Sequence, residues 1–212
     1  MIEHRSKNPN LDLAPLITQA VLNPHIDKET LLQSCDAAKH FGFGGLCTNL
    51  NQLATARERL GSASKTKLIA VIAFPFGSIP LSLKVAQAEW AEANGAEGLE
   101  VAPNYKALTE NKLDIFSEEL AEICSIGLPV QAILDMNCLQ SDNLSNAIEA
   151  SIDAGVSALQ CGNGFGPGVT LENINKLKEL IKGRCAIEAV GGINNLEKAL
   201  ALIEAGANSL GT

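Results

Sequence analysis

One unit recurs along the chain: an amphipathic helical pattern ends in a small residue and glycine, and a short apolar segment follows almost at once. The clearest instances are HFGFGGLC, EANGAEGLEV, ICSIGLPVQAIL, IDAGVSALQ and IEAGANSLG. Glycine suits the left-handed position just past a helix, and the apolar segments are too short and too uniformly apolar for a half-exposed antiparallel sheet. This repetition of helix, glycine and strand predicts a parallel sheet with helical crossovers.

The number of these elements favours a closed barrel. Strands are predicted at residues 17–22, 45–48, 68–74, 98–102, 130–134, 158–161, 186–190 and 209–211. Helices are predicted at 28–41, 50–60, 81–94, 114–125, 142–154, 170–181 and 196–205, with Asp27, Asn49, Ser141 and Asn195 as N-caps. We expect one α/β domain, a (β/α)8 TIM barrel over residues 17–212, after an N-terminal segment at 1–16 and with its last helix missing. An open doubly wound sheet is the alternative, but no G-x-G-x-x-G follows the first strand.

Composition and charge narrow the class of partner. The 212 residues are 46% hydrophobic, enough to bury the core of one domain, and the formal net charge is −8. No cluster of lysine or arginine stands out, so we expect neither a nucleic acid nor an anionic membrane as partner. The chain shows no apolar signal core and no run of about 18 uncharged apolar residues, so a cytoplasmic protein is expected. Its six cysteines form no C-x-x-C pair and are expected to be reduced core residues.

Polar side chains stand near the carboxyl ends of the predicted strands, where barrels carry their chemistry. Glu100 lies in the fourth strand, Gln160 in the sixth and Glu188 in the seventh, while Asp135 and Asn137 follow the fifth. A buried carboxylate needs a partner or a proton. Two interpretations remain open: Gln160 and Glu188 bond to each other, or to other polar groups of the core, to fill the barrel, or they face a ligand. The glycine-rich turns that follow both residues favour the ligand.

Two glycine-rich turns follow neighbouring strands. GNGFGPG comes after the sixth strand, GGI comes after the seventh, and a further glycine closes the eighth. Glycines let the backbone approach an anion, and the helix expected from residue 170 directs its first N–H groups toward the first turn. Together they predict a site for the phosphate group of a small phosphorylated ligand. The residues assigned to it are Gly164, Phe165, Gly191, Gly192 and Gly211.

Metal chemistry is not expected from the histidines. The three in the chain stand at positions 4, 25 and 40, and none lies within metal-ligand spacing of another. An all-oxygen magnesium site of Glu100, Asp135 and Glu188 stays open as an alternative, because three inward carboxylates would need a cation to coexist. Otherwise we expect neither a metal nor a cofactor.

Several segments together resemble the deoxyribose-phosphate aldolase family over nearly the whole length of the chain. They are HFGFGGLCTN, VIAFPFG, ANGAEGLEVAPN, GNGFGPG and EAVGGINNLEKALALIEAGANSLGT. The resemblance implies a barrel enzyme that works through a lysine Schiff base. It also implies that Gly164, Gly191, Gly192 and Gly211 correspond to the family's phosphate-binding glycines. The family's serine-bearing turn and closing helix have no counterpart before Thr212.

The positions that the resemblance makes catalytic carry other residues here. Gln160 stands where the family has its Schiff-base lysine, and Glu188 stands where it has a second lysine. Glu100 stands at the family's aspartate and keeps a carboxylate, whereas Thr-Gln-Ala at 18–20 replaces an Asp-His-Thr type of run. A neutral amide cannot form an imine with an aldehyde, so the resemblance implies a retained anion site without the imine.

We therefore expect a family member that binds a small phosphorylated sugar or related anion and lacks normal aldolase activity. One alternative is an isomerisation or carbon–carbon cleavage in which Glu100 and Glu188 act as acid and base. Others are a working aldolase with a relocated lysine and a purely structural protein. Lys106, after the fourth strand, is the one candidate for relocation, because Lys84 on the third helix is expected to point outward.

Absence of a final helix also predicts an uncovered apolar face. The outer side of the barrel near Leu210 and Ile17 is apolar, and a barrel does not leave such a face in water. Either residues 11–16 or a second subunit must cover it. We expect a homodimer.

Overall fold

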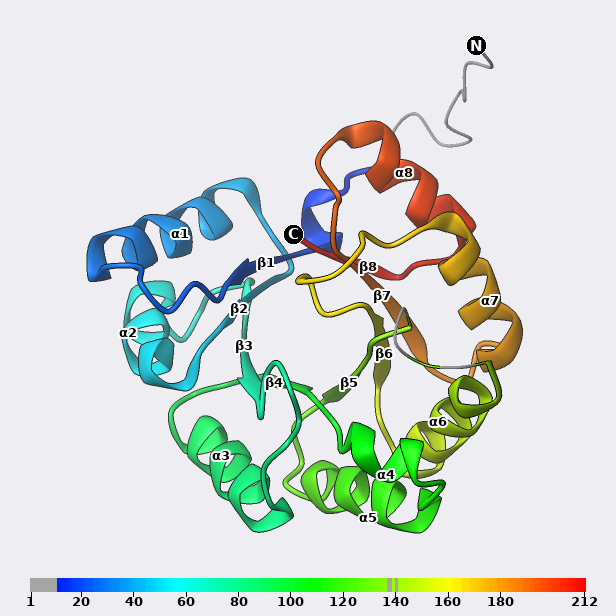
Figure 1. The fold of residues 1–212 in the computed structure, drawn as a ribbon. Helices are drawn as coiled ribbons and strands as arrows, with labels where there is room; N and C mark the ends of the chain where they lie inside the picture. Colours follow the sequence, from blue (N-terminus) through cyan, green and yellow to red (C-terminus); the bar gives the residue numbers. More distant parts are fainter. Residues whose placement is uncertain (1–10, 137–138, 140) are drawn as a thin grey trace.

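The computed structural model describes residues 11–212 except 137, 138 and 140. Within this part of the chain, eight parallel strands form a closed barrel in chain order, with β1 beside both β2 and β8, and helices surround it (Figure 1). The strands are β1 (Ile17–Val21), β2 (Gly45–Thr48), β3 (Lys67–Ile72), β4 (Gly98–Val101), β5 (Val130–Leu134), β6 (Ala158–Cys161), β7 (Ala186–Val190) and β8 (Ser209–Gly211). The predicted (β/α)8 barrel is confirmed, and the open sheet is excluded.

The predicted helices are all present, with bounds that agree with the prediction to within one residue. They are α1 (Lys28–Phe41), α2 (Leu50–Leu60), α3 (Leu81–Ala93), α5 (Leu113–Cys124), α6 (Ser141–Asp153), α7 (Leu171–Ile181) and α8 (Leu196–Ala205). A further short helix, α4 (Tyr105–Thr109), follows β4. The sequence does not predict α4, because five residues are too few to show a helical period.

Capping side chains explain where several helices begin. Asp27 and Asn195 each accept a hydrogen bond from a backbone N–H of the first helical turn at 2.8 Å, so both predicted N-caps are confirmed. Asn49 precedes α2 as predicted, but its side chain makes no capping bond. Ser141 is the first residue of α6 rather than the residue before it, and its side chain lies outside the described part.

The hydrophobic core has two parts, which follow from the alternation of side chains along each strand. Outward residues such as Leu46 and Leu159 are fully buried in the larger part, between the strands and the helices. Inward residues Cys47, Ile69 and Val71 form a small apolar cluster inside the barrel. The polar residues that share this interior are therefore surrounded by apolar side chains and strand backbone.

The N-terminal segment fills the part of the helical ring between α8 and α1. A 3-10 turn at Ala14–Leu16 lies there (Figure 1), and Leu13 packs against the main core. A Cβ on Gly44 would meet the carbonyl oxygen of Pro15 at 2.1 Å, so this segment lies directly on the start of β2. Leu210 is fully buried. Residues 11–16 thus cover the predicted apolar face at Leu210, whereas Ile17 beside it is half-buried.

Lys84 is buried, so the prediction that it points outward from α3 is wrong. Its exposed fraction is 0%, and its Nζ lies 2.6 Å from Glu119 Oε1 on α5 and donates to Ala102 O at 3.0 Å. The same Glu119 oxygen accepts a hydrogen bond from Asn104 N at 2.9 Å. The charged partner lies 35 positions along the chain, so the sequence around Lys84 gives no sign of it.

The cysteines of the described residues are free, and Cys35, Cys47 and Cys161 are buried in the cores, as predicted for reduced thiols. Two others are half-buried, and Cys138 lies outside the described residues. A search of the described helices for a membrane span finds none that is both long enough and apolar enough.

Candidate active site

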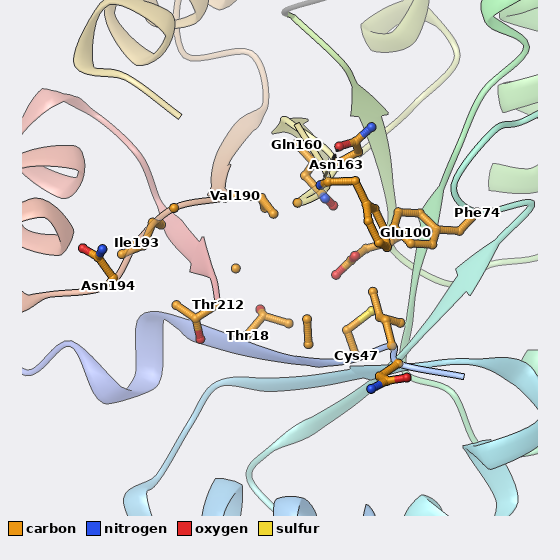
Figure 2. Close-up of a pocket in the computed structure, with 18 of the residues that line it drawn as sticks. Thr18, Cys47, Phe74, Glu100, Gln160, Asn163, Val190, Ile193, Asn194 and Thr212 are labelled. Atoms are coloured by element: carbon orange, nitrogen blue, oxygen red, sulfur yellow. Dashed lines mark hydrogen bonds between the residues drawn. The ribbon is translucent and has the colours of Figure 1, made fainter. Parts of the chain in front are cut away.

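A cavity of about 510 Å³ opens at the carboxyl ends of the strands, where the sequence places its candidate chemistry. Figure 2 shows the carboxyl group of Glu100, from β4, pointing into this space, with Cys47 from β2 beside it. The lining residues are Thr18, Ala20, Leu22, Asn23, Pro24, Cys47, Phe74, Glu100, Gln160, Asn163, Gly164, Phe165, Val190, Gly191, Gly192, Ile193, Asn194, Gly211 and Thr212. No lysine, arginine or histidine of the described chain is among them.

Gln160 and Glu188 are register partners on β6 and β7, but they do not bond to each other. Gln160 lines the cavity and is 3% exposed, and its Nε2 donates to Gly162 O at 3.0 Å. Glu188 is 1% exposed and lies behind the cavity wall. Gln160 Oε1 has no hydrogen-bond partner among the described residues. Thr18 and Gln131 lie close enough to the Glu188 carboxyl group to lower its pKa, although neither makes a hydrogen bond of good geometry to it. The interpretation that these two side chains bond to each other is therefore wrong. Its other form, in which they interact with further polar groups of the core, is supported by Gly162 O at Gln160 and by Thr18 and Gln131 at Glu188.

Burial keeps both carboxyl groups of the barrel interior partly protonated near neutral pH. It raises the pKa of Glu100 to about 8, with the nearby Glu188 adding to the rise and the Cys47 thiol opposing it. It also raises the pKa of Glu188 to about 7, against the opposing effects of Thr18 and Gln131. Burial and the Glu100 charge raise the pKa of Cys47 as well, so this thiol stays protonated and is a poor nucleophile.

A rise in pH should destabilise the protein through these two carboxyl groups. Their pKa values in the folded chain, about 8 and about 7, lie above the ordinary value of 4.5, so the folded state binds more protons than the unfolded state. The resulting stabilisation is complete below pH 4.5 and is lost as the pH rises to about 8. We expect the free energy of unfolding, measured by urea titration, to fall by roughly 6 kcal/mol between pH 5 and 8.5.

Two amide variants check the source of this pH dependence. Glu100→Gln keeps the size of the side chain and cannot ionise, so the variant should lose a large part of the slope. Glu92→Gln, at an exposed position of α3, should keep the slope of the parent chain. An equal slope in Glu100→Gln and the parent chain would contradict the raised pKa of Glu100.

The two glycine turns lie against each other at the mouth of the cavity. All five residues predicted for the phosphate site line it: Gly164, Phe165, Gly191, Gly192 and Gly211. Gly191 and Gly192 have φ values of 102° and 66°, which favour glycine. A Cβ on Gly192 would lie 3.0 Å from Gly168 Cα, and Val169 N donates to Gly191 O at 3.1 Å. The two backbones therefore touch and form one continuous surface without side chains between them.

A lysine that the sequence pattern did not single out lies beside these turns. Lys198, in the first turn of α8, donates from Nζ to Gly192 O at 2.9 Å. A Cβ on Gly168 would lie 3.3 Å from the same Nζ. This ammonium group brings a positive charge to the backbone surface of the predicted anion site. The sequence could have indicated Lys198 by its distance from the glycines. It lies six residues after Gly192, in the first turn of the next helix, and side chains on a helix point toward its N-terminus and so toward these glycines.

The turn after β6 is held in place by polar contacts of Asn163. Its Nδ2 donates to Asp135 Oδ2 at 3.0 Å, and its Oδ1 accepts from Phe165 N at 2.9 Å. Phe165 is 72% exposed and lies against Phe74, with ring centroids 5.6 Å apart. Two aromatic rings thus border the cavity. Asn137, which follows the fifth strand, lies outside the described residues.

Two alternatives raised by the sequence lack the geometry that they need. Glu100, Asp135 and Glu188 do not gather into a metal site, and the described residues hold no other group of three His, Cys, Asp or Glu that could bind a metal ion. Lys106 lies on α4 with its side chain 81% exposed and its Nζ 3.5 Å from Glu110 Oε1. It does not line the cavity, as a relocated Schiff-base lysine would have to.

Similar proteins match this chain over most of its length. A deoxyribose-phosphate aldolase of Trichormus variabilis is 37% identical over 205 residues, which cover 96% of this chain and 90% of that protein. The chain belongs to the deoxyribose-phosphate aldolase family. A scan against protein-family models finds no match.

Solved structures agree with this assignment to the deoxyribose-phosphate aldolase family. An aldolase named QR15 is 33% identical, with a TM-score of 0.91 over 95% of this chain and 91% of that one. The deoxyribose-phosphate aldolase of Aeropyrum pernix, described as a tetramer, is 26% identical, with a TM-score of 0.84 over 94% of this chain and 86% of that one. The family and the barrel implied by the sequence resemblance are confirmed.

In this deoxyribose-phosphate aldolase family member, the first strand contributes small side chains to the site. Thr18 and Ala20 line the cavity, whereas Gln19 does not. Gln19 Oε1 is buried and has no hydrogen-bond partner in the described part of the chain. The ionisable side chains of the cavity wall are thus the Glu100 carboxyl group and the Cys47 thiol, both held protonated by burial. The wall can exchange a proton with a ligand, but it presents no amine.

Proposed function

We propose that this chain binds a small phosphorylated sugar or a related anion in its barrel cavity and does not catalyse the imine reaction of an aldolase. The observation that carries this proposal is the cavity wall, which has two touching glycine turns at its mouth and no lysine among its described residues. Gln160 occupies the strand position at which the family resemblance implies the Schiff-base lysine.

The chemistry of the wall supports binding without covalent catalysis. An amide nitrogen is not basic, because its lone pair is delocalised, so Gln160 cannot attack an aldehyde. Its Nε2 is also engaged with Gly162 O at 3.0 Å. Glu188 replaces the second lysine with a buried acid, which cannot lower the pKa of an amine as a neighbouring cation does. Both parts of the imine machinery are therefore missing together.

The mouth of the cavity retains the features of an anion site. Glycines at positive φ expose the backbone to a ligand, and the turn after β7, one of the two that touch here, stands where barrels commonly hold phosphate. Lys198 adds a cation whose Nζ lies 2.9 Å from Gly192 O. Because the phosphate contacts come from the backbone, they do not depend on the residues at positions 160 and 188.

Substitution of Gly192 should weaken the binding of phosphorylated ligands. The methyl group of Gly192→Ala would lie 3.0 Å from Gly168 Cα, at a residue with a φ of 66°. The two turns must then move apart, and we expect the dissociation constants of deoxyribose 5-phosphate and glycerol 3-phosphate to rise about tenfold or more. Isothermal titration calorimetry measures this change. Deoxyribose without phosphate should bind neither protein at millimolar concentration.

Gly183→Ala is the matched control for the backbone conformation. Gly183 has a φ of 76°, and a Cβ there would meet nothing within 4 Å. This variant therefore has the same strain as Gly192→Ala without the contact between turns, and its affinity should equal that of the parent chain. Saturating phosphorylated ligand should also raise the melting temperature of the parent chain. No binding and no thermal shift with either phosphate would contradict the proposed function.

A second function is favoured by the position of Glu100, whose carboxyl group points into the cavity and whose pKa is raised to about 8 by burial. A carboxyl group with a pKa near the working pH is suited to general acid or base catalysis. The reaction would be a proton transfer, such as the isomerisation of a phosphorylated sugar, rather than an imine-dependent cleavage. Exchange of ligand C–H protons in deuterated water, followed by NMR, would support this function if Glu100→Gln abolished it.

We also propose that the chain forms a homodimer. Leu83 and Trp90 are 53% and 44% exposed, and they lie seven residues apart on α3, which places them on one face of the helix. A relative from Aeropyrum pernix is described as a tetramer. Light scattering at micromolar concentration should give the mass of a dimer, and Trp90→Glu should shift it toward a monomer. A monomeric parent chain would contradict this proposal.

A further inference from the structure

The deep part of the cavity has an excess of hydrogen-bond acceptors. Gln160 lines the cavity, and its Oε1 is buried and has no partner among the described residues. Behind it, Gln131 Oε1 is also buried without a partner in this part of the chain, and the Glu188 carboxyl group has only Thr18 and Gln131 beside it. Glu100 adds a carboxyl group that points into the cavity (Figure 2). A buried polar atom without a partner is costly, so a set of orphaned acceptors indicates a ligand that supplies donors.

Charge points to the same conclusion. The groups that face this region are Thr18 from β1, Cys47 from β2, Glu100 from β4, Gln131 from β5, Gln160 from β6 and Glu188 from β7. Two of these six side chains are acids, and none is a cation. A carboxylate buried in this way needs either a proton or a positive partner. An ammonium group on a ligand would provide that partner and three donors at once.

We propose that the ligand of this cavity carries a primary ammonium group, which lies against Glu100 and Gln160, in addition to the phosphate at the glycine turns. This proposal rests on the proposed function, because it assumes that the phosphate is held at the mouth. The ligand class is an amino-substituted alkyl or sugar phosphate. The amine belongs to the ligand, so no covalent bond forms with the protein.

Binding of such a ligand should release protons. Without a cation, burial raises the pKa of Glu100 to about 8 and that of Glu188 to about 7, so both groups hold protons near pH 7. An ammonium group beside them favours the carboxylate form and lowers both pKa values. A net release of up to about one proton per ligand bound is expected at pH 7. A hydroxyl group in the same place is uncharged and should release none.

The test is calorimetric titration of the full chain with two matched series of probes. One series is ω-aminoalkyl phosphates with chains of two to five carbons, and the other is ω-hydroxyalkyl phosphates of the same lengths. We expect the best aminoalkyl phosphate to bind about tenfold more tightly than its hydroxyl counterpart. Titration in buffers with different ionisation enthalpies measures the proton release of each pair. The phosphate group is common to both series, so its own protonation largely cancels in the chains of four and five carbons, where the amine is far from the phosphate.

The comparison of the two ligand series uses the parent chain alone. Variants then show where in the cavity the ammonium group of the ligand binds. Glu100→Gln should reduce the amine preference toward one and leave the affinity for hydroxyalkyl phosphates similar. Glu92→Gln, at an exposed position of α3, should leave the preference unchanged. Circular dichroism melting curves show whether each variant is folded under the conditions of the titration.

The outcomes separate the two proposals. Tighter binding of the amine series with proton release supports the ammonium site. Equal affinity of the two series, with no proton release, overturns the ammonium site and leaves the phosphate site standing. Absence of binding in both series overturns both proposals. Equal binding of an alkylamine with and without its phosphate supports the ammonium site and contradicts the phosphate site.

Discussion

Borohydride reduction in the presence of a phosphorylated aldehyde is expected to leave the parent chain without a specific adduct. An imine needs a lysine that reaches the bound aldehyde, and no lysine lines the cavity in the described part of the chain. Cleavage of deoxyribose 5-phosphate should likewise fall at least about 10⁴-fold below that of an active family member, because no lysine in the described cavity wall can act as the nucleophile. Mass spectrometry of the reduced protein and a coupled assay for the aldehyde product measure the two effects.

Gln160→Lys is the positive control for the trapping experiment. The substitution places an amine in the cavity wall at the site of Gln160, so borohydride should trap an adduct that peptide mapping assigns to this position. Lys106→Arg is the matched control for labelling of an exposed lysine, since the Lys106 side chain is 81% exposed. A stoichiometric adduct on the parent chain that disappears in Lys106→Arg would contradict the proposed function and identify a relocated nucleophile.

Loss of the buried charge of Lys84 should destabilise the fold strongly. Lys84→Met would leave Glu119 without its partner at 2.6 Å and Ala102 O without its donor at 3.0 Å, in a region where Lys84 is 0% exposed. Removal of one member of a buried ion pair leaves an uncompensated charge, and a loss of about 3 to 5 kcal/mol in the free energy of unfolding is expected. Chemical denaturation measures it.

Two further variants distinguish charge from packing. The double variant Lys84→Met with Glu119→Leu removes both charges and should recover a large part of the lost stability. Lys112→Met breaks the ion pair between Lys112 and Glu110, whose N–O distance is also 2.6 Å. These two side chains are 53% and 38% exposed, so the variant should change the free energy of unfolding little. A similar loss in Lys84→Met and Lys112→Met would contradict the importance of burial.

The repeating local pattern of the chain determined its helices and strands. Segments such as β2, β5 and α1 have the predicted bounds, because glycine at a helix end and apolar residues in the strand are local signals. The number and order of these segments were enough to predict a closed barrel. The motif GNGFGPG and the residue at position 160 likewise led from the sequence to two proposals, a phosphate site after the sixth strand and the loss of the Schiff-base lysine.

Contacts between distant segments could not be predicted from the sequence. Lys84 and Glu119 are 35 positions apart, and a lysine on a helix usually faces solvent, so its burial follows only from how α3 and α5 pack. Lys198 and α4 were missed for other reasons, which are local. Lys198 donates to a backbone carbonyl six positions away, which no residue type signals, and the five residues of α4 are too few to show a helical period. The sequence by itself determined the barrel, the family and the residues at the strand ends. Only the tertiary structure decided that Gln160 and Glu188 do not bond to each other, since hydrogen bonds and burial depend on the full set of neighbours in space.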